Sequence, residues 1–235
     1  MKPWNAEDLD FDADTFSGVA RLFPLPNLVL YPHVMQPLHI YEERYREMVE
    51  DALAGDKLIA MAVLQPGWEN DYESRPPVSS YACLGKIVAH NRLPDGRYNL
   101  LVLGVQRIHI DHELDPLRSF RQASVELIDD NYDFDTPAQN QCLQEKLLAA
   151  FRNNLSCECE APEELEKLLS GEVPLGLLTD LAAYALPLDT AVKQELLAEC
   201  RVSARAAILL SQVEQLAEDS SAKSSHPFPP LFSDN

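Results

Sequence analysis

Cysteine and histidine are the residue types in this sequence best suited to catalysis or metal binding. Cys157 and Cys159 are separated by one residue in SCECE, and Cys142 lies one segment earlier. A tetrahedral zinc site needs four nitrogen or sulfur ligands at compatible spacing. No second cysteine pair and no nearby histidine in the sequence completes such a set. The spacing therefore favours unpaired thiols over a zinc site.

Two other sets of polar residues are weaker candidates for a metal site. His109 and His112 in RIHIDHE lie three residues apart, which suits one face of a helix, whereas VQRIHI has the composition of a strand. The acidic segment 126–137, ELIDDNYDFDTP, has carboxylates for calcium but lacks the glycine-containing pattern of an EF-hand loop. We therefore expect packed or solvated histidines, a solvated acidic linker and no bound metal.

The common catalytic motifs are also missing from the sequence. The one Gly-Lys pair, Gly85-Lys86, is followed by Ile87 inside a strand pattern, so it does not close a phosphate-binding loop. The nucleophile elbow G-x-S-x-G is absent. We therefore predict that the protein is not an enzyme and uses no cofactor.

The formal net charge of −19, from 19 basic and 38 acidic residues, argues against phosphate-rich partners. Nucleic acids and anionic membranes both attract basic faces, and the sequence has no basic cluster. No apolar run reaches the length of a membrane span, and MKPWNAEDLDFDADTF lacks a signal-peptide core. Five cysteines are an odd number, which fits reduced thiols. We predict a cytoplasmic protein without nucleic-acid or membrane partners.

Aromatic and apolar side chains in loop-like segments are the best candidates for a functional surface. Tyr31, His33 and Met35 lie between prolines, and Trp68 and Tyr72 lie in the polar segment QPGWENDYESRPPVSS. Aromatic residues on loops are enriched at binding surfaces. The same side chains could instead cover the core from above. The sequence leaves both interpretations open for these five residues.

The first half of the chain predicts strands around one helix. Proline removes a hydrogen-bond donor from a strand, so Pro24 and Pro26 predict two short strands within residues 20–30. A helix is predicted next, ending at Gly55, because apolar residues recur at helical spacing. These residues are Tyr41, Tyr45, Met48, Val49, Ala52 and Leu53. LIAMAVL (58–64) then predicts a strand buried on both faces.

Four more strands are expected before residue 129. The turn Pro94-Asp95-Gly96 predicts a hairpin, because proline fixes φ and glycine permits a positive φ. Its strands are CLGKIVAHNRL and YNLLVLG, and the other two strands lie at 105–110 and 120–128. We expect antiparallel neighbours. Helices are too sparse among these strands for a doubly wound sheet.

After the acidic segment the periodicity becomes helical. The first predicted helix has Leu143, Leu147, Leu148 and Phe151 on one face, and the others lie at 162–170, 174–186, 189–199 and 202–216. A Ser- and Pro-rich tail follows, which we expect to be flexible. The predicted fold is α+β, in five parts: an acidic lead (1–19), a β-rich subdomain (20–128), an acidic linker (129–136), a helical subdomain (137–217) and the tail (218–235).

The stretch LFPLPNLVLYPHVMQPLHIYEERYREMV (22–49) resembles the start of the amino-terminal, substrate-recognition domain of the ATP-dependent protease Lon. That pattern has a Pro-Leu, a short apolar strand, an aromatic-Pro pair, and a second Pro-Leu before a helix. The matching residues here are Pro24-Leu25, Leu28 to Leu30, Tyr31-Pro32 and Pro37-Leu38. On this resemblance, the prolines shape short, bent strands of a small pseudo-barrel.

Two later stretches extend the resemblance over about residues 20–217. LGKIVAHNRLPDGRYNLLVLGVQRIHI has the family's glycine before a strand, its turn, and Gly-x-x-Arg at Gly104 and Arg107. ALPLDTAVKQELLAECRVSAR is similar to the helical half of the family domain. The matching residues there are Pro187-Leu188, Lys193-Gln194, Leu196-Leu197, Val202 and Arg205.

The resemblance implies a non-enzymatic protein that binds unfolded or tagged polypeptides, as a substrate-recognition or adaptor module for a protease or chaperone complex. A complete Lon continues into ATPase and peptidase modules, and this sequence ends before either, so hydrolytic activity is not implied. The alternative is a small-ligand protein or an unrecognised enzyme that uses a cleft between the two halves. Converging polar groups with perturbed pKa values would favour that alternative, and an apolar groove would favour polypeptide binding.

Overall fold

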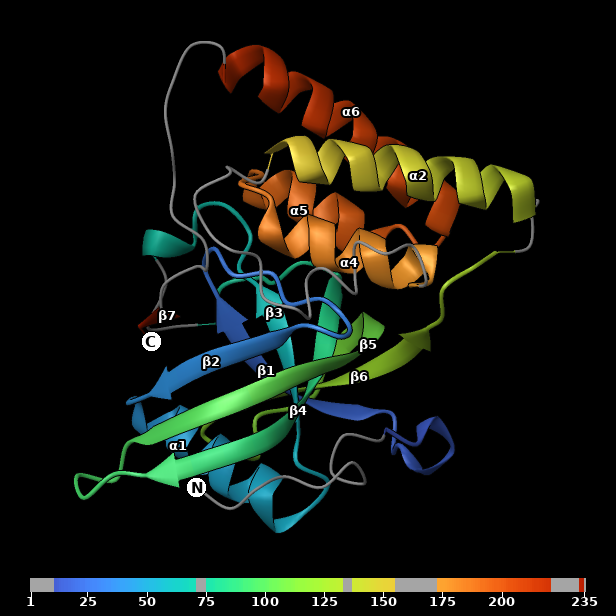
Figure 1. The fold of residues 1–235 in the computed structure, drawn as a ribbon. Helices are drawn as coiled ribbons and strands as arrows, with labels where there is room; N and C mark the ends of the chain where they lie inside the picture. The colour runs from blue at the N-terminus through green and yellow to red at the C-terminus, as the bar shows by residue number, and fades with distance from the viewer. Residues whose placement is uncertain (1–10, 71–74, 133–136, 155–172, 221–232, 235) are drawn as a thin grey trace. The chain divides into compact units, whose positions relative to one another are not determined.

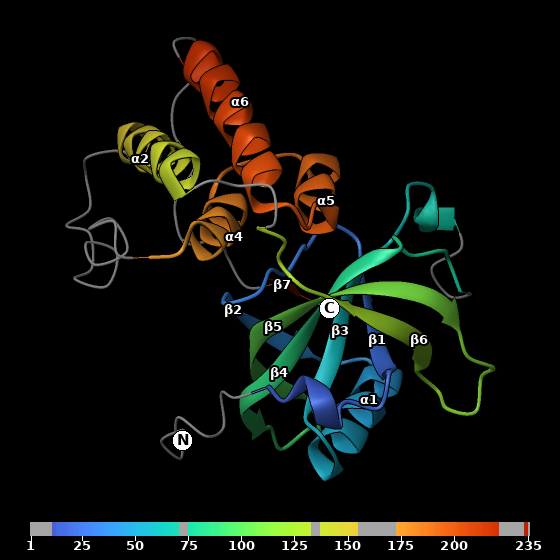
Figure 2. The same cartoon turned by 90° about the vertical axis from the view of Figure 1, so that its right-hand side faces the viewer.

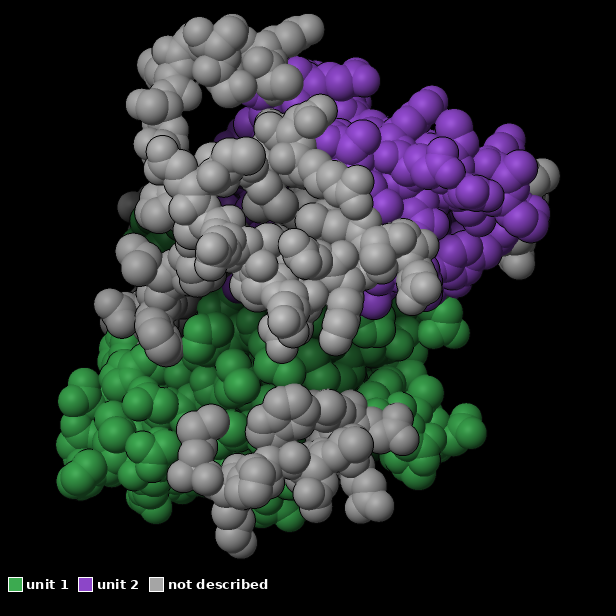
Figure 3. All heavy atoms as spheres, viewed as in Figure 1, with its two compact units in different colours: residues 1–129, 231–235 green, residues 130–230 purple. Residues whose placement is uncertain are grey.

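The computed structural model describes residues 11–70, 75–132, 137–154, 173–220 and 233–234 (Figure 1). The chain divides into two compact units, which Figure 3 shows in different colours. Unit 1 contains residues 1–129 and 231–235, and unit 2 contains residues 130–230. Among the described residues, no helix is both long enough and apolar enough to cross a bilayer.

In its described residues, unit 1 is a mixed sheet with one α-helix, α1 (Glu43–Ala54). Its strands are β1 (Val19–Leu25), β2 (Met35–Ile40), β3 (Leu58–Val63), β4 (Tyr81–Arg92), β5 (Tyr98–Glu113), β6 (Arg121–Ile128) and β7 (Ser233–Asp234). They pair in the order β4-β3-β1-β6-β5-β2-β7, and β4 also pairs with β5. The sheet therefore curls back on itself, as Figure 2 shows, but β2 and β7 continue past β5 and it is not a closed barrel.

Most neighbouring strands are antiparallel, as predicted, but β1 with β3 and β2 with β7 are parallel. The chain leaves β1, passes through β2 and α1, and returns as β3 in the same direction. Parallel neighbours require such a crossover connection, whereas a tight turn joins antiparallel ones. Every residue of β3 is buried, which explains the unbroken apolar run LIAMAVL. On one side, Phe23 of β1 meets Tyr45 of α1 edge to face at 4.7 Å.

Two local predictions for unit 1 were wrong, and one strand was missed. Pro24 does not separate two strands, because it lies inside β1, opposite Ala62 of β3. Residues 98–104 and 105–110 are one long strand, β5, whose register shifts between Ile110 and His112. A bulge of this kind lets a strand bend without ending. In addition, β2, which contains Pro37, was not predicted from the residues.

Unit 2 consists of α-helices in the described residues. They are α2 (Pro137–Asn154), α4 (Leu175–Ala185), α5 (Thr190–Ala198) and α6 (Val202–Ser220). These four agree with the predicted helices, except that α6 continues to Ser220, and the predicted helix at 162–170 lies outside the described residues. α6 packs against the other three through apolar residues (Figure 1). The buried residues include Leu147, Leu178, Ala182, Leu196, Leu209 and Val213.

A buried arginine organises the polar interior of unit 2. Arg205 on α6 is fully buried, and its Nη1 and Nη2 donate to the two carboxylate oxygens of Asp130 at 2.9 and 2.8 Å. Its Nε donates to Thr179 Oγ1 at 2.8 Å and lies 3.6 Å from Asp180, which is also buried. Asp130 belongs to the segment predicted to be a solvated linker. It is instead part of the helical unit, and Asn131 beside it bridges to Arg201.

Replacing Arg205 by methionine should cost about 3–5 kcal/mol of unfolding free energy, because Asp130 and Asp180 would lose their common buried cation. The matched control is Arg201→Met, which removes an exposed arginine paired with Glu199 at 2.9 Å. That pair should contribute at most about 1 kcal/mol. Urea unfolding followed by helical circular dichroism measures both. Equal losses in the two variants would show that the buried network does not hold unit 2 together.

Candidate functional site

The proline-rich segment reaches the sheet by crossing β5 at a glycine. His33 N–H donates to the carbonyl oxygen of Gly104 at 2.7 Å, and Gly104 N–H donates to Val34 at 2.8 Å. A Cβ atom on Gly104 would overlap the carbonyl oxygen of Tyr31. Only glycine allows the two backbones to approach so closely. His33 has a positive φ of 66°, which turns the chain there into β2.

β2 then runs antiparallel to β5, with Met35 opposite Leu103 and Ile40 opposite Tyr98. Its side chains alternate between the core and the outside. Gln36, Leu38 and Ile40 are buried, whereas Met35 is 39% exposed and Tyr41, just after the strand, is 46% exposed. The outward face of β2 therefore presents apolar and aromatic side chains. We call Met35, Pro37, His39 and Tyr41 the β2 face.

The backbone of β2 follows the same period of two. In an antiparallel pair, every second residue of a strand directs its N–H and C=O to the same neighbouring strand. Gly104 N–H donates to the carbonyl oxygen of Val34, so we assign the main-chain groups of Gln36 and Leu38 to the same ladder with β5. Met35, Pro37 and His39 turn their main-chain groups toward the other edge of the strand. Pro37 has no N–H to offer there, which is the position where a strand tolerates proline. This explains how β2 forms around a residue that the sequence treats as a strand breaker.

Polar groups at the hairpin end of β5 border the β2 face. His39 Nδ1 lies 2.7 Å from Asn99 Oδ1, and the Arg97 guanidinium lies 3.4 Å from His39 Nε2. Arg97 also pairs with Asp95, and that hydrogen bond lowers the pKa of the Asp95 carboxyl. Burial, and then a hydrogen bond to Glu50, raise the pKa of Tyr98. Near the aromatic stack of His39 and Tyr41, whose ring centroids are 6.5 Å apart, Arg97 supplies a positive charge.

The structure separates the five predicted surface residues. Tyr31 is fully buried, so its side chain belongs to the core. His33 and Met35 are exposed at the start of β2. Trp68 is partly buried in a short 3₁₀ turn between β3 and β4, strands that are not neighbours of β2, and Tyr72 lies outside the described residues. The sequence missed His39 and Tyr41, although their alternation with Leu38 and Ile40 is a strand signal.

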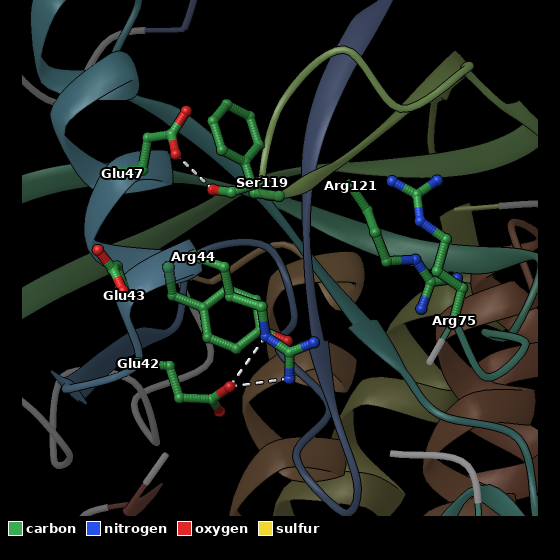
Figure 4. A pocket seen from close by; sticks show the side chains of 9 residues that line it. Glu42, Glu43, Arg44, Glu47, Arg75, Ser119 and Arg121 are labelled. Atoms are coloured by element: carbon green, nitrogen blue, oxygen red, sulfur yellow. Dashed lines mark hydrogen bonds and ion pairs between the residues drawn. The ribbon is translucent and has the colours of Figure 1, made fainter. Parts of the chain in front are cut away.

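A recess lies beside α1 and has a volume of about 780 Å³ (Figure 4). Several of its polar side chains have partners in the protein. Glu47 accepts from Ser119, and Arg44 pairs with Glu42. Arg121 pairs with Glu113 and also donates to the Pro76 carbonyl oxygen at 2.8 Å. Figure 4 shows Glu47 directed at Ser119 and Arg44 at Glu42, so these groups are engaged with one another and do not converge on a shared point as the polar groups of a catalytic or small-ligand site do.

One group of possible metal ligands occurs among the described residues. His109, Asp111 and Glu126 have ligand atoms within 4.8 Å of one another, and His109 Nδ1 lies 3.2 Å from Asp111. The cross-strand register of β5 with β6 brings Glu126 opposite His109, which the sequence spacing could not show. The two carboxylates are exposed, and no other feature there points to an ion. Of the candidate zinc thiols, Cys142 is exposed, and Cys157 and Cys159 lie outside the described residues.

Comparison with known proteins identifies the family. The model of the ATP-dependent protease La (LON) substrate-binding domain matches residues 19–215, and the chain belongs to this family. Lon protease of Dictyoglomus thermophilum is 30% identical over 187 residues, which are 80% of this chain and 23% of that protein. Lon protease of Xanthomonas oryzae is 25% identical over 82% of this chain and 22% of its own length. The chain thus spans about a quarter of these curated relatives.

Two solved structures share the fold. The Lon N-terminal domain protein from Xanthomonas campestris is 21% identical, with a TM-score of 0.60 over 82% of this chain and 97% of that structure. The N-terminal domain of the Mycobacterium avium complex Lon protease is 19% identical, with a TM-score of 0.65 over 83% of this chain and 98% of that structure. The mixed α+β fold predicted from the sequence is therefore confirmed.

Replacing Gly104 by alanine should destabilise unit 1 by about 3 kcal/mol, because the new methyl group meets backbone that cannot move without displacing β2. Gly67→Ala is the control. Unlike Gly104, Gly67 has a positive φ, of 93°, but it has open space around it, so only backbone strain of about 1 kcal/mol is expected. Urea unfolding followed by tryptophan fluorescence compares them. A smaller loss for Gly104→Ala than for Gly67→Ala would contradict the close approach.

Proposed function

We propose that this protein is a non-enzymatic recognition module that binds unfolded or tagged polypeptides in proteolysis. The observation that carries the proposal is the match of residues 19–215 to a domain family described by its substrate binding. The β2 face supports it with exposed apolar and aromatic side chains beside a strand edge. Its partners would be polypeptide clients and a protease or chaperone complex, in the cytoplasm. We expect neither ATP hydrolysis nor cleavage of unfolded protein.

The chemistry of the β2 face sets the expected strength and selectivity. Met35 and Tyr41 can cover apolar side chains of a client, but binding must order a flexible chain, so the expected Kd is about micromolar. The net charge of −19 should favour clients that combine basic and apolar residues over acidic ones. Added salt should weaken their capture because it screens this attraction. The alternative function, as a small-ligand protein or enzyme, gains no observation from the described residues.

The test is fluorescence anisotropy with an unfolded, labelled peptide rich in basic and apolar residues. The double variant Met35→Ser with Tyr41→Ser should bind it about tenfold more weakly, because two exposed apolar contacts are lost. Leu117→Ser is the control, since Leu117 is a large apolar side chain that is 89% exposed elsewhere in unit 1. That variant should bind as the wild type does.

Circular dichroism checks that all three proteins are folded to the same extent. If the folded double variant binds the peptide as tightly as wild type, the β2 face is not the binding surface. If the wild type binds no unfolded peptide at any salt concentration, the recognition function itself is contradicted.

A further inference from the structure

The outer edge of β2 is occupied by a segment of the same chain. Ser233 and Asp234 form β7, which pairs with β2 in parallel, with Leu38 opposite Ser233 and His39 opposite Asp234. Residues 231–235 belong to unit 1, although 130–230 between them and the rest of that unit belong to unit 2. A distant part of the sequence thus returns to the sheet at one particular strand.

Among the described residues, the pairing covers only part of the edge. β2 has six residues, and β7 pairs with two of them, Leu38 and His39. Met35 and Pro37 precede the paired stretch, and Met35 directs its main-chain groups to the same edge by the alternation described above. A strand that lies in an edge position with unused main-chain groups can accept another strand. A two-residue strand is held by few hydrogen bonds, so a longer strand can replace it.

We propose that β2 accepts an extended client polypeptide as an added strand, and that β7 is an intramolecular occupant which the client displaces. This inference rests on the proposed function and specifies how the client binds. Main-chain hydrogen bonds to a sheet edge give affinity that depends little on the client's sequence, which suits recognition of unfolded chains. The side chains of Met35, His39 and Tyr41 would then contact alternate residues of the client.

Occupation by β7 has two physical consequences. It shields the edge from pairing with other copies of the chain, which is the usual hazard of an exposed strand. It also reduces the fraction of molecules that are able to bind a client, and the apparent affinity decreases in proportion to that fraction. If β7 only protects the edge from other copies of the chain, removing β7 should not change the affinity for a client. If β7 also occupies the client site, removing it should increase that affinity.

The first experiment frees the edge in the full chain. Ser233→Pro with Asp234→Pro removes both N–H groups of β7, one of which faces β2 by the alternation of a strand, and we expect it to tighten binding of the labelled unfolded peptide by about fivefold. The control is the same double change at Ser224 and Ser225, outside β7, which should leave the Kd unchanged. An unchanged Kd in the Ser233→Pro, Asp234→Pro variant, or equal tightening in both variants, would overturn the proposal.

The second experiment tests strand addition through the client. Two versions of the peptide are made with N-methyl groups on alternate residues, one set at odd positions and one at even positions. An added strand turns only one of these sets toward β2, so one version should lose at least about tenfold in affinity and the other much less. Equal binding by both versions and the unmethylated peptide would overturn strand addition.

The two experiments also distinguish this inference from the function on which it rests. If the peptide binds, and its Kd changes neither with the prolines in β7 nor with methylation, the recognition function stands and the proposed binding mode is overturned. Absence of any binding, including by the variant with a freed edge, would remove the recognition function as well.

Discussion

The contact between the backbone of Tyr31 and the Cα atom of Gly104 determines where β2 lies. No side chain fits between them, and the two hydrogen bonds between Gly104 and residues 33–34 hold the segment against β5. Gly85 on β4 also allows close packing, because a Cβ there would overlap the side chain of Val102 and crowd that of Leu30. The apolar segment between Pro26 and β2 is therefore packed across the hairpin of β4 and β5. This packing leaves β2 as the strand beyond β5.

That arrangement explains the position of each proline in this region separately. Pro24 lies in β1, and Pro32 is buried beside Tyr31. Pro37 lies in β2 where its missing N–H faces the outer edge, so the ladder to β5 is not interrupted. It also removes one donor from that edge, which is a common way to limit unwanted pairing. Within the described residues, Pro37 and β7 thus protect part of this edge, and β7 does not extend to Met35.

Local signals in the sequence predicted much of this fold. The turn Pro94-Asp95-Gly96, the end of α1 at Gly55 and the buried run of β3 all depend on neighbouring residues, and the structure has them. The parallel pairing of β1 with β3 depends on distant segments, so no local pattern contains it. β5 was predicted as two strands that meet at Gly104, whereas the structure has one strand in which Gly104 allows a close approach of two backbones.

The candidate site was predicted less well for the same reason. Aromatic character alone could not separate buried Tyr31 from exposed Tyr41, because their burial depends on which strand each residue adjoins. Likewise, Arg205 was found through a family motif, but its burial against Asp130 and Thr179 appears only when α4 and α6 pack together. Met35 and His33 were predicted to be on the surface and are exposed; whether they bind a client stays a prediction.

Amide hydrogen exchange, followed by NMR on the full chain with and without saturating unfolded peptide, tests the central claim most directly. If a client joins the edge of β2, the Met35 amide should gain protection on binding. The Gln36 and Leu38 amides, which we assign to the ladder with β5, should serve as internal references and change little. Protection that changes only in unit 2 or around Trp68, with Met35 unaffected, would contradict the assignment of polypeptide recognition to β2.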